Sequence, residues 1–146
     1  MTTPRWLSLA VIACALLLPG CVGPGITDKD DSPNAALKIE VPESARPLGG
    51  YVDPYRVEFL MPNDQWRGYV AKYSLSPLEQ SPYISQSVVP SWCMPASRAG
   101  VQLTRWVAGG DIQYLDTDMH AYRSVSVTPD CEPGNAYVIW VLGKPK

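Results

Sequence analysis

Residues 55–61 read YRVEFLM, a stretch in which apolar and charged side chains alternate. In an extended chain the apolar residues at positions 55, 57, 59 and 61 would share one face, and Arg56 and Glu58 would lie on the other. Successive side chains of a β-strand point to opposite faces, so this period of two predicts a strand with one buried face. The fold is therefore expected to be built from strands.

The same pattern recurs on both sides of this stretch. Further strands are expected at residues 37–41, 69–75, 83–89, 101–107, 112–115, 119–127 and 137–142. The last of these reads YVIWVL, and such a continuous apolar run is typical of a strand that is buried on both faces. Prolines interrupt the intervals, and since a proline inside a helix costs about 3 kcal/mol, the sequence excludes a helical bundle.

Turn signals separate the expected strands. Between residues 101–107 and 112–115 lie Gly109 and Gly110, which can take the positive φ values that a tight hairpin turn needs. Short strands joined by such turns indicate an all-β fold, a single small β-sandwich of about seven to eight mainly antiparallel strands. We expect this domain to span residues 37–146, following a signal peptide and a flexible tether.

The first 20 residues are typical of an export signal. Residues 1–5 carry one basic side chain, and residues 6–18 form an apolar run. As a helix this run would be roughly 20 Å long, well short of the ~30 Å hydrocarbon core of a bilayer. A short permanent anchor or a buried core helix is the alternative, but the run has no polar face and its flanks are those of an export signal.

Leu18, Pro19, Gly20 and Cys21 resemble a lipobox, the processing motif of bacterial lipoproteins. The resemblance covers only the first 21 residues, and Pro19 departs from the more common small or β-branched residue. It implies that residues 1–20 are a signal peptide, that the chain is cut before Cys21, and that acyl chains such as palmitate are attached at Cys21. Because each buried methylene adds about 0.8 kcal/mol, two or three acyl chains would hold the protein at a membrane.

The residues around the lipobox add detail to this expectation. Cys14 is a second conceivable acceptor, but its use would leave a very short apolar run. Val22 follows Cys21, and in lipoproteins of Gram-negative bacteria the absence of aspartate at that position implies transport to the outer membrane, with the domain in the periplasm. Residues 21–36 are rich in Gly, Pro and Asp and are expected to form a lipidated tether of roughly 20 Å, or a leader without a spacing role.

Charge and motifs exclude several function classes. The expected mature chain keeps 11 of the 12 basic residues and all 14 acidic ones, for a net charge of about −3 with His120 neutral. Nucleic-acid binding needs clustered Lys and Arg, and no such cluster is present. The sequence also has no G-x-S-x-G, H-E-x-x-H or phosphate-binding glycine motif, so we expect neither an enzyme nor a cofactor.

Cys93 and Cys131 are expected to form a disulfide. Export would place them in an oxidising compartment, where such a bond persists. Closing a loop of about 39 residues would destabilise the unfolded chain by roughly 4 kcal/mol. A reactive thiol or a redox pair is the alternative, but neither cysteine belongs to a C-x-x-C motif.

Asp116, Asp118 and His120 fall at every second position, with Asp111 nearby. In an extended segment the three side chains would lie on one side and could hold a divalent cation. The alternative is that the aspartates form a turn between strands and that His120 faces solvent. The segment has no glycine-bearing calcium-loop signature, so no metal site is expected.

Three tryptophans are candidate partner-binding residues: Trp66 in an expected loop, Trp92 beside Cys93, and Trp106 on the polar face of residues 101–107. Exposed tryptophans anchor protein interfaces and stack on sugar rings. The alternative is that each covers the end of a small sandwich.

Three function classes remain open. The first is a non-catalytic lipoprotein whose domain binds a periplasmic or envelope protein, either as an accessory of an envelope or secretion complex or as a toxin-immunity protein; the chain resembles small tethered β lipoproteins of both sorts in layout only. The second is a glycan or peptidoglycan binder that uses the aromatic side chains. The third is a hydrolase or metal protein centred on Asp116, Asp118 and His120.

Overall fold

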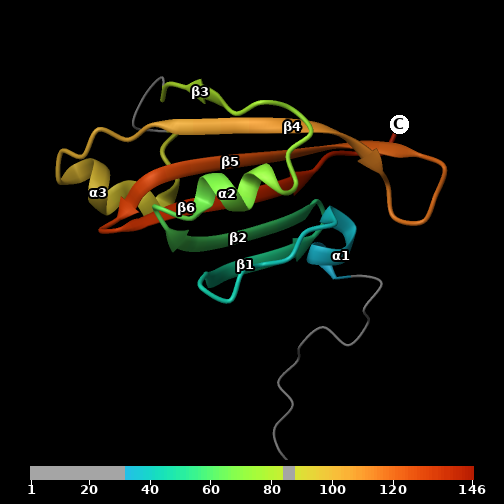
Figure 1. The fold of residues 1–146 in the computed structure, drawn as a ribbon, viewed down its shortest axis with the longest axis horizontal. Coiled ribbons are helices and arrows are strands. Elements are labelled where there is room, and N and C mark those ends of the chain that lie inside the picture. Colours follow the sequence, from blue (N-terminus) through green and yellow to red (C-terminus); the bar gives the residue numbers. More distant parts are fainter. Residues whose placement is uncertain (1–31, 84–87) are drawn as a thin grey trace, which may run out of the picture.

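The computed structural model describes residues 32–83 and 88–146 (Figure 1). The predicted signal peptide, Cys21 and most of the predicted tether lie outside these residues, as does the middle of the strand expected at 83–89. Within the described ranges, six antiparallel strands form one sheet in the order β1-β2-β6-β5-β4-β3, which confirms the all-β class. No helix in these ranges is long and apolar enough to cross a membrane.

The strands predicted most directly from the sequence are present. The six strands are β1 (Arg46–Val52), β2 (Tyr55–Pro62), β3 (Glu79–Ser81), β4 (Arg105–Gln113), β5 (His120–Glu132) and β6 (Asn135–Leu142). The YVIWVL stretch lies in β6, which is hydrogen-bonded to β2 on one side and β5 on the other. Val138, Trp140 and Leu142 of β6 are at most 1% exposed, as a central strand requires.

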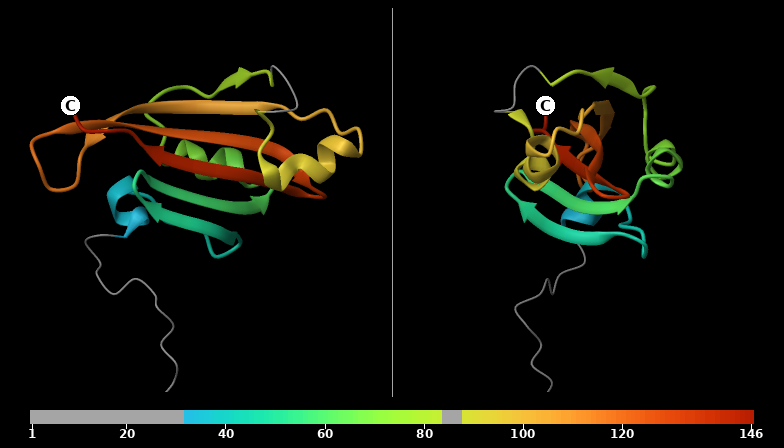
Figure 2. Two further views of the ribbon diagram at one scale, coloured as in Figure 1. Left: turned by 180° about the vertical axis from the view of Figure 1, so that it is seen from behind. Right: turned by 90° about the vertical axis from the view of Figure 1, so that its left-hand side faces the viewer.

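Short helices pack against the two faces of the sheet (Figure 2). The inner face packs against α1 (Pro33–Leu37) and α2 (Trp66–Ala71), and Trp140 and Phe59 lie in this main core. The outer face packs, over part of its area, against η2 (Ser91–Cys93) and α3 (Met94–Arg98). A smaller apolar cluster lies there: Leu60, Cys93, Cys131 and Tyr137.

The prediction of a strand at residues 69–75 is wrong, because the chain there forms α2 and the loop after it. Trp66, Tyr69, Val70 and Tyr73 are spaced at i, i+3, i+4 and i+7, and all four pack into the main core. That spacing places them on one face of a helix. Over so short a segment, the spacing of Tyr69 and Tyr73 fits the period of a strand as well as that of a helix.

The hairpin expected at Gly109 and Gly110 is also wrong, since β4 runs through both glycines and the turn to β5 lies at residues 114–119. The two glycines instead allow neighbouring segments to pack closely against β4. A Cβ atom on Gly109 would lie 2.8 Å from the carbonyl oxygen of Arg123, and one on Gly110 would lie 2.5 Å from the Cβ of Leu75. Neighbouring segments therefore approach β4 where no side chain would fit.

The folded domain begins before the boundary expected at residue 37. Ser32 caps α1, because its hydroxyl oxygen accepts a hydrogen bond of 3.1 Å from the backbone N–H of Ala35, and Pro33 follows at the first position of the helix. Ala36 and Leu37 are at most 1% exposed. Residues 33–36 thus belong to the core rather than to the predicted tether. The prediction of a strand at 37–41 is wrong, because the end of α1 and the loop after it occupy these residues.

Arg123 joins both inner helices to the sheet. The residue is only 5% exposed, and its guanidinium donates hydrogen bonds to the carbonyl oxygens of Leu37, at 2.9 Å, and of Tyr73. Leu37 is the last residue of α1, and Tyr73 lies two residues after the end of α2, so Arg123 supplies a donor at each helix end. The guanidinium also lies 5.2 Å from the centre of the Trp140 ring. One side chain of β5 therefore binds the ends of two helices.

Candidate functional site

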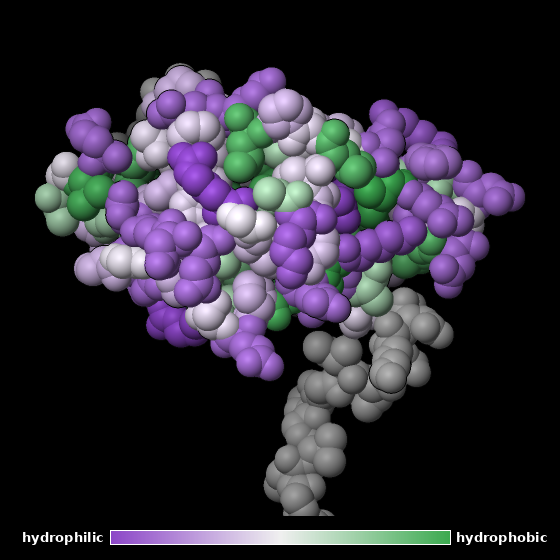
Figure 3. Space-filling model, in the orientation of Figure 1, coloured by the Kyte–Doolittle hydropathy of each residue, from purple (hydrophilic) through white to green (hydrophobic). Residues whose placement is uncertain are grey.

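An apolar groove of about 700 Å³ lies at the end of the molecule that carries α3. One wall comes from η2, α3 and the residues that follow, and the other from the end of β5 and the turn to β6. We call it the α3 groove; its apolar lining consists of Trp92, Pro95, Ala96, Ala99, Val101 and Pro133. Figure 3 shows a few hydrophobic residues at this end of the molecule, and others over the middle and the opposite end of the same face.

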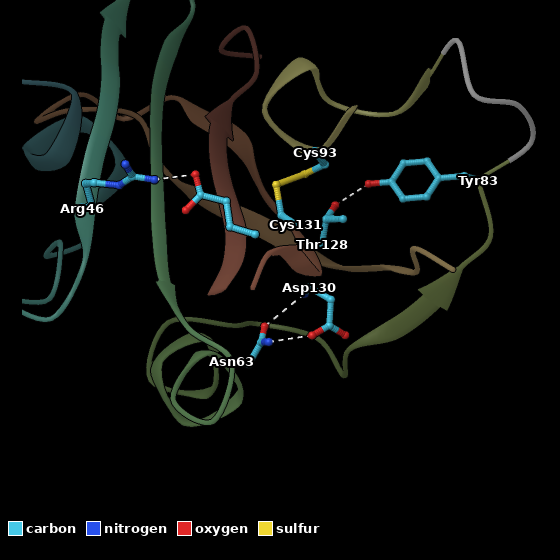
Figure 4. Close-up of a disulfide and its surroundings, with 8 residues drawn as sticks. Arg46, Asn63, Tyr83, Cys93, Thr128, Asp130 and Cys131 are labelled. Atoms are coloured by element: carbon cyan, nitrogen blue, oxygen red, sulfur yellow. Dashed lines mark hydrogen bonds and ion pairs between the residues drawn. A yellow bond between two sulfur atoms is a disulfide. The ribbon is translucent and has the colours of Figure 1, made fainter. Parts of the chain in front are cut away.

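The predicted disulfide between Cys93 and Cys131 is present and joins the two walls of the groove (Figure 4). Cys93 ends η2 and Cys131 lies in β5, and their Cα atoms are 4.4 Å apart. Both cysteines are at most 1% exposed. Because α3 has only five residues and starts directly after Cys93, this bond fixes its position on the sheet.

Trp92, one of the three predicted partner-binding residues, lies at this groove. Its side chain is 45% exposed although it is held between Ser91 and the buried Cys93. Val101, on the same wall, is 40% exposed. Large apolar side chains that are exposed side by side in a concave surface mark interaction sites.

Asn63 holds Asp130, one of the residues that line the groove, in place. The Nδ2 group of Asn63 donates to Oδ1 of Asp130 at 2.7 Å, and the backbone N–H of Asp130 donates to Oδ1 of Asn63 at 3.1 Å (Figure 4). Asp130 has a positive φ of 57°, a conformation that aspartate tolerates better than most residues. The two hydrogen bonds therefore hold both its backbone and its carboxylate in place.

The carboxylate of a second lining residue, Glu132, is directed toward β1. It accepts a hydrogen bond of 2.6 Å from the guanidinium of Arg46, which extends from β1. The side chain of Arg46 is 59% exposed, so this is a surface ion pair, a type that adds little stability. The carboxylates of Asp130 and Glu132 are thus both engaged by residues that do not line the groove, Asn63 and Arg46.

Buried tyrosines support the sheet beneath this end of the molecule. The hydroxyl of Tyr83 shares a hydrogen bond with the hydroxyl of Thr128, and burial raises the pKa of Tyr83 above its usual value of 10.0. Burial also raises the pKa of Tyr137, and the carboxylate of Glu58 beside it raises it further. Both phenols therefore stay neutral at physiological pH and act as structural groups.

Trp66 and Trp106 do not belong to this surface, which corrects two of the expected anchors. Trp66 is 2% exposed, because it starts α2 and faces the core rather than standing in a loop. Trp106 is partly buried, with its ring centre 6.1 Å from that of Trp66, and the guanidinium of Arg67 lies 4.3 Å from the centre of each ring. These two tryptophans form a structural stack capped by an arginine.

Asp116, Asp118 and His120 lie where the alternative interpretation put them. The two aspartates stand exposed in the turn between β4 and β5, and His120 is the exposed first residue of β5. Thr117 closes the turn, since its hydroxyl donates to the carbonyl oxygen of Tyr114 at 2.6 Å. Across residues 32–83 and 88–146, no three His, Cys, Asp or Glu side chains are placed to hold a metal ion.

Sequence reasoning missed the residues that shape the groove around Trp92. Asn63 and Asp130 are 67 positions apart, so no local pattern connects them. The α3 residues Pro95, Ala96 and Ala99 fall in a helix of five residues, too short for a helical period to be visible. The available signal was Pro90 and Pro95, which exclude a strand between them and favour a compact turn at Trp92.

No protein-family model matches the chain, and no curated protein or solved structure is significantly similar to it. The features that bear on function are therefore the geometry of the α3 groove and the N-terminal sequence.

Proposed function

We propose that this protein is a lipid-anchored lipoprotein of the bacterial cell envelope whose β domain binds a protein partner through the α3 groove, without catalysis. The observation that carries the proposal is an exposed tryptophan, Trp92, in an apolar groove whose two walls are joined by a disulfide. Tryptophans in rigid concave sites are the residue type that contributes most to protein interfaces. An accessory subunit and a toxin-immunity protein would both use such a surface.

The chemistry of the groove supports binding rather than catalysis. The polar residues that line it are Ser91, Asp130 and Glu132. A serine nucleophile needs a base within hydrogen-bond reach, and His120, the one histidine of the chain, begins β5 at the end of the sheet away from α3 (Figure 1). The sulfur atoms of Cys93 and Cys131 are engaged in the disulfide.

The arrangement of the helices is also consistent with an anchored binding protein. The helices α1 and α3 lie toward opposite ends of the sheet (Figures 1 and 2). The N-terminal segment, with the lipobox at Cys21, precedes α1 in the sequence. A domain held from its α1 end would present the groove away from the membrane, which for a Gram-negative outer-membrane lipoprotein is the periplasm.

Site-specific photo-crosslinking in cells tests the proposal. Ala99 is exposed on the groove wall, whereas Ala71 is exposed on α2, on the other side of the sheet, and serves as the matched control. A photoreactive phenylalanine at position 99 is expected to give a crosslinked species of defined mass that disappears when Trp92→Ala is added. The proposal fails if position 71 crosslinks as well as position 99, or if neither yields a protein adduct.

Glycan binding is the second candidate, and one observation favours it. Tyr51 and Tyr122 are 46% and 49% exposed, and both lie on the outer face of the sheet. Beside Tyr122, a hollow of about 490 Å³ includes Ser124 and Ser126. Co-sedimentation with purified peptidoglycan sacculi distinguishes the two: a glycan binder would lose binding in Tyr122→Ala and keep it in Trp92→Ala.

A further inference from the structure

We infer that the corner of the sheet where β1 ends docks on the membrane that holds the lipid anchor, with Tyr51 and Val52 in contact with the lipid surface. The inference rests on the proposed function, because it takes the anchor at Cys21 as given, and it adds an orientation of the domain on the bilayer. Three observations carry it: the exposure of these two side chains, their place beside the start of α1, and the short stretch of sequence between that helix and Cys21.

Tyr51 and Val52 are exposed at the end of an edge strand. Val52 is 59% exposed, more than any other large apolar side chain in the described ranges, and Tyr51 is 46% exposed. No other two of the exposed large apolar side chains in these ranges are consecutive in sequence. Within the same ranges, β1 pairs with β2 alone. Adjacent apolar side chains on an open sheet edge mark a contact surface.

The two side chains lie on opposite faces of the sheet. A Cβ atom on Gly50 would lie 3.5 Å from Pro33, so the face that Gly50 shares with Val52 is the one that carries α1. The Tyr51 ring lies on the outer face, with the guanidinium of Arg56 4.2 Å from its centre. A flat surface can touch both Tyr51 and Val52 only at the edge of the sheet, so the docked domain would stand on the end of β1.

The sequence that leads to the anchor begins beside this corner. Pro33 is the first residue of α1 and lies against β1 at Gly50, two positions before Val52 (Figure 1). Ten residues, 22–31, lie between Cys21 and the described domain, and a stretch of that length spans at most about 40 Å. An acylated Cys21 therefore keeps the end of β1 near the lipid headgroups. Even a weak contact forms there, because the tether makes its effective concentration high.

The chemistry of the corner fits an apolar contact with lipid rather than an electrostatic one. Tyrosine suits a membrane interface, because its ring is apolar and its hydroxyl reaches the headgroups. The basic charge beside Tyr51 is already compensated, since Nε of Arg56 lies 2.8 Å from Oε1 of Glu58. Asp53, which is exposed, follows Val52 and adds a negative charge. The contact should therefore depend neither on anionic lipids nor on salt.

Docking by this corner keeps the α3 groove clear of the membrane. The groove is built on β5, which lies three strands from β1 in the sheet. Neighbouring strands are about 4.8 Å apart, so β5 stands roughly 14 Å from β1. Along the strands, β2 starts beside the end of β1 and finishes beside the turn from β5 to β6, which lines the groove. The groove and the docking corner are therefore at opposite ends of the sheet (Figures 1 and 2).

Photo-crosslinking to lipid tests the inference on the mature, acylated protein, purified in detergent and reconstituted into phosphatidylcholine vesicles. A photoreactive phenylalanine at position 53, in the exposed turn after Val52, is expected to give phospholipid adducts that mass spectrometry detects. Replacing Tyr51 and Val52 together by serine should lower the adduct yield about fivefold, because the apolar contact is lost. The same reporter at position 99, in the α3 groove, should give no lipid adducts. Added phosphatidylglycerol or salt should leave the yield at position 53 unchanged.

Leu75→Ser is the matched control for the two serine substitutions. Leu75 is 58% exposed, much like Val52, but it lies against Gly110 of β4, four strands away from β1. Its replacement is expected to leave the yield of lipid adducts at position 53 unchanged. The midpoint of thermal unfolding shows whether each variant is folded, and the intact mass shows whether each carries acyl chains.

Each other outcome overturns the inference. Adducts at position 53 that persist without Tyr51 and Val52 would mean that the tether alone brings this turn to the lipid. Equal yields at positions 53 and 99 would mean that the domain has no preferred orientation, and adducts that require phosphatidylglycerol and vanish in salt would replace the apolar contact by an electrostatic one. An acylated chain without lipid adducts refutes the docking but leaves the proposed function intact, whereas a chain without acyl mass refutes the anchor and the docking together.

Discussion

At the scale of single residues, Arg123 shows how a buried charge holds this fold together. The alternation of β5 puts it in a row with Ala121, Val125 and Val127, so a charged residue in an apolar row was visible in the sequence. Its partners, the carbonyls at the ends of α1 and α2, were not visible, because they lie 86 and 50 positions away.

Replacing Arg123 by alanine is expected to lower the free energy of unfolding by about 3 kcal/mol, because the carbonyls of Leu37 and Tyr73 would lose a charged donor while buried. Urea unfolding monitored by circular dichroism measures the change. Arg98→Ala, on exposed α3, is the control and should change stability by less than about 0.5 kcal/mol. Equal effects of the two substitutions would contradict the assigned role.

Two glycine-to-alanine substitutions are expected to change stability in opposite directions. Gly109→Ala should lower the free energy of unfolding by about 1–3 kcal/mol, since the new methyl group would meet Arg123 backbone and the Tyr122 ring. Gly68→Ala, in α2, meets nothing within 4 Å and should raise it by up to about 1 kcal/mol. Thermal unfolding of both variants gives the comparison, and stabilisation by Gly109→Ala would show that β4 is less closely covered than described.

Tyr137 makes the stability depend on alkaline pH. Burial and the neighbouring Glu58 raise its pKa above 10.0, so the folded state keeps the proton that the unfolded state loses. Its contribution is complete below about pH 10 and is lost as the pH rises toward the folded-state pKa, at up to about 1.4 kcal/mol per pH unit. Between pH 9.5 and 11, wild-type unfolding free energy should therefore fall more steeply than that of Tyr137→Phe; parallel curves would exclude this linkage.

At the scale of elements, strands were predictable where the pattern was long or continuous. β2, β5 and β6 follow from strict alternation or from an unbroken apolar run, and their positions agree with the sequence analysis. The helices α1 and α2 have five and six residues, fewer than two turns, so their period is too short to compete with an apparent period of two. Gly109 was misread because a glycine needed for close packing looks the same in sequence as one needed for a turn.

The disulfide is expected to stabilise one element more than the rest. Replacing Cys93 and Cys131 together by alanine removes a constraint that spans 38 positions. The free energy of unfolding should fall by roughly 4 kcal/mol, since the reduced chain gains entropy when it unfolds. Hydrogen exchange should rise first in η2 and α3, whereas β6 stays protected between its two neighbours. Uniform loss of protection would mean that the bond supports the whole sheet rather than one wall of the groove.

At the scale of the whole molecule, half of the candidate site followed from the sequence. Trp92 and the Cys93–Cys131 pair were identified by residue type and compartment, and the structure brings them together. Asp130, which also lines the groove, and its partner Asn63 meet only through the pairing of distant strands, which composition and spacing do not encode.

The anchoring proposal makes a prediction about the intact chain. Wild-type protein expressed in a Gram-negative host is expected to sediment with membranes, to lack residues 1–20, and to carry the mass of attached acyl chains minus the hydrogens lost on forming the disulfide. Cys21→Ser should keep its full length and no acyl mass. Intact mass spectrometry after fractionation decides, and an uncleaved, unacylated wild-type chain would refute the lipoprotein assignment.

We expect the covalent link between the two groove walls to determine when a new copy of the protein can bind its partner. Because η2 and α3 are tied to β5 through Cys93 and Cys131, we expect the groove to be complete only after these thiols have been oxidised. Reducing compartments such as the bacterial cytoplasm prevent that step. If the chain is exported as we propose, a newly made copy would not engage its partner at the ribosome, and its binding surface would mature only at the destination.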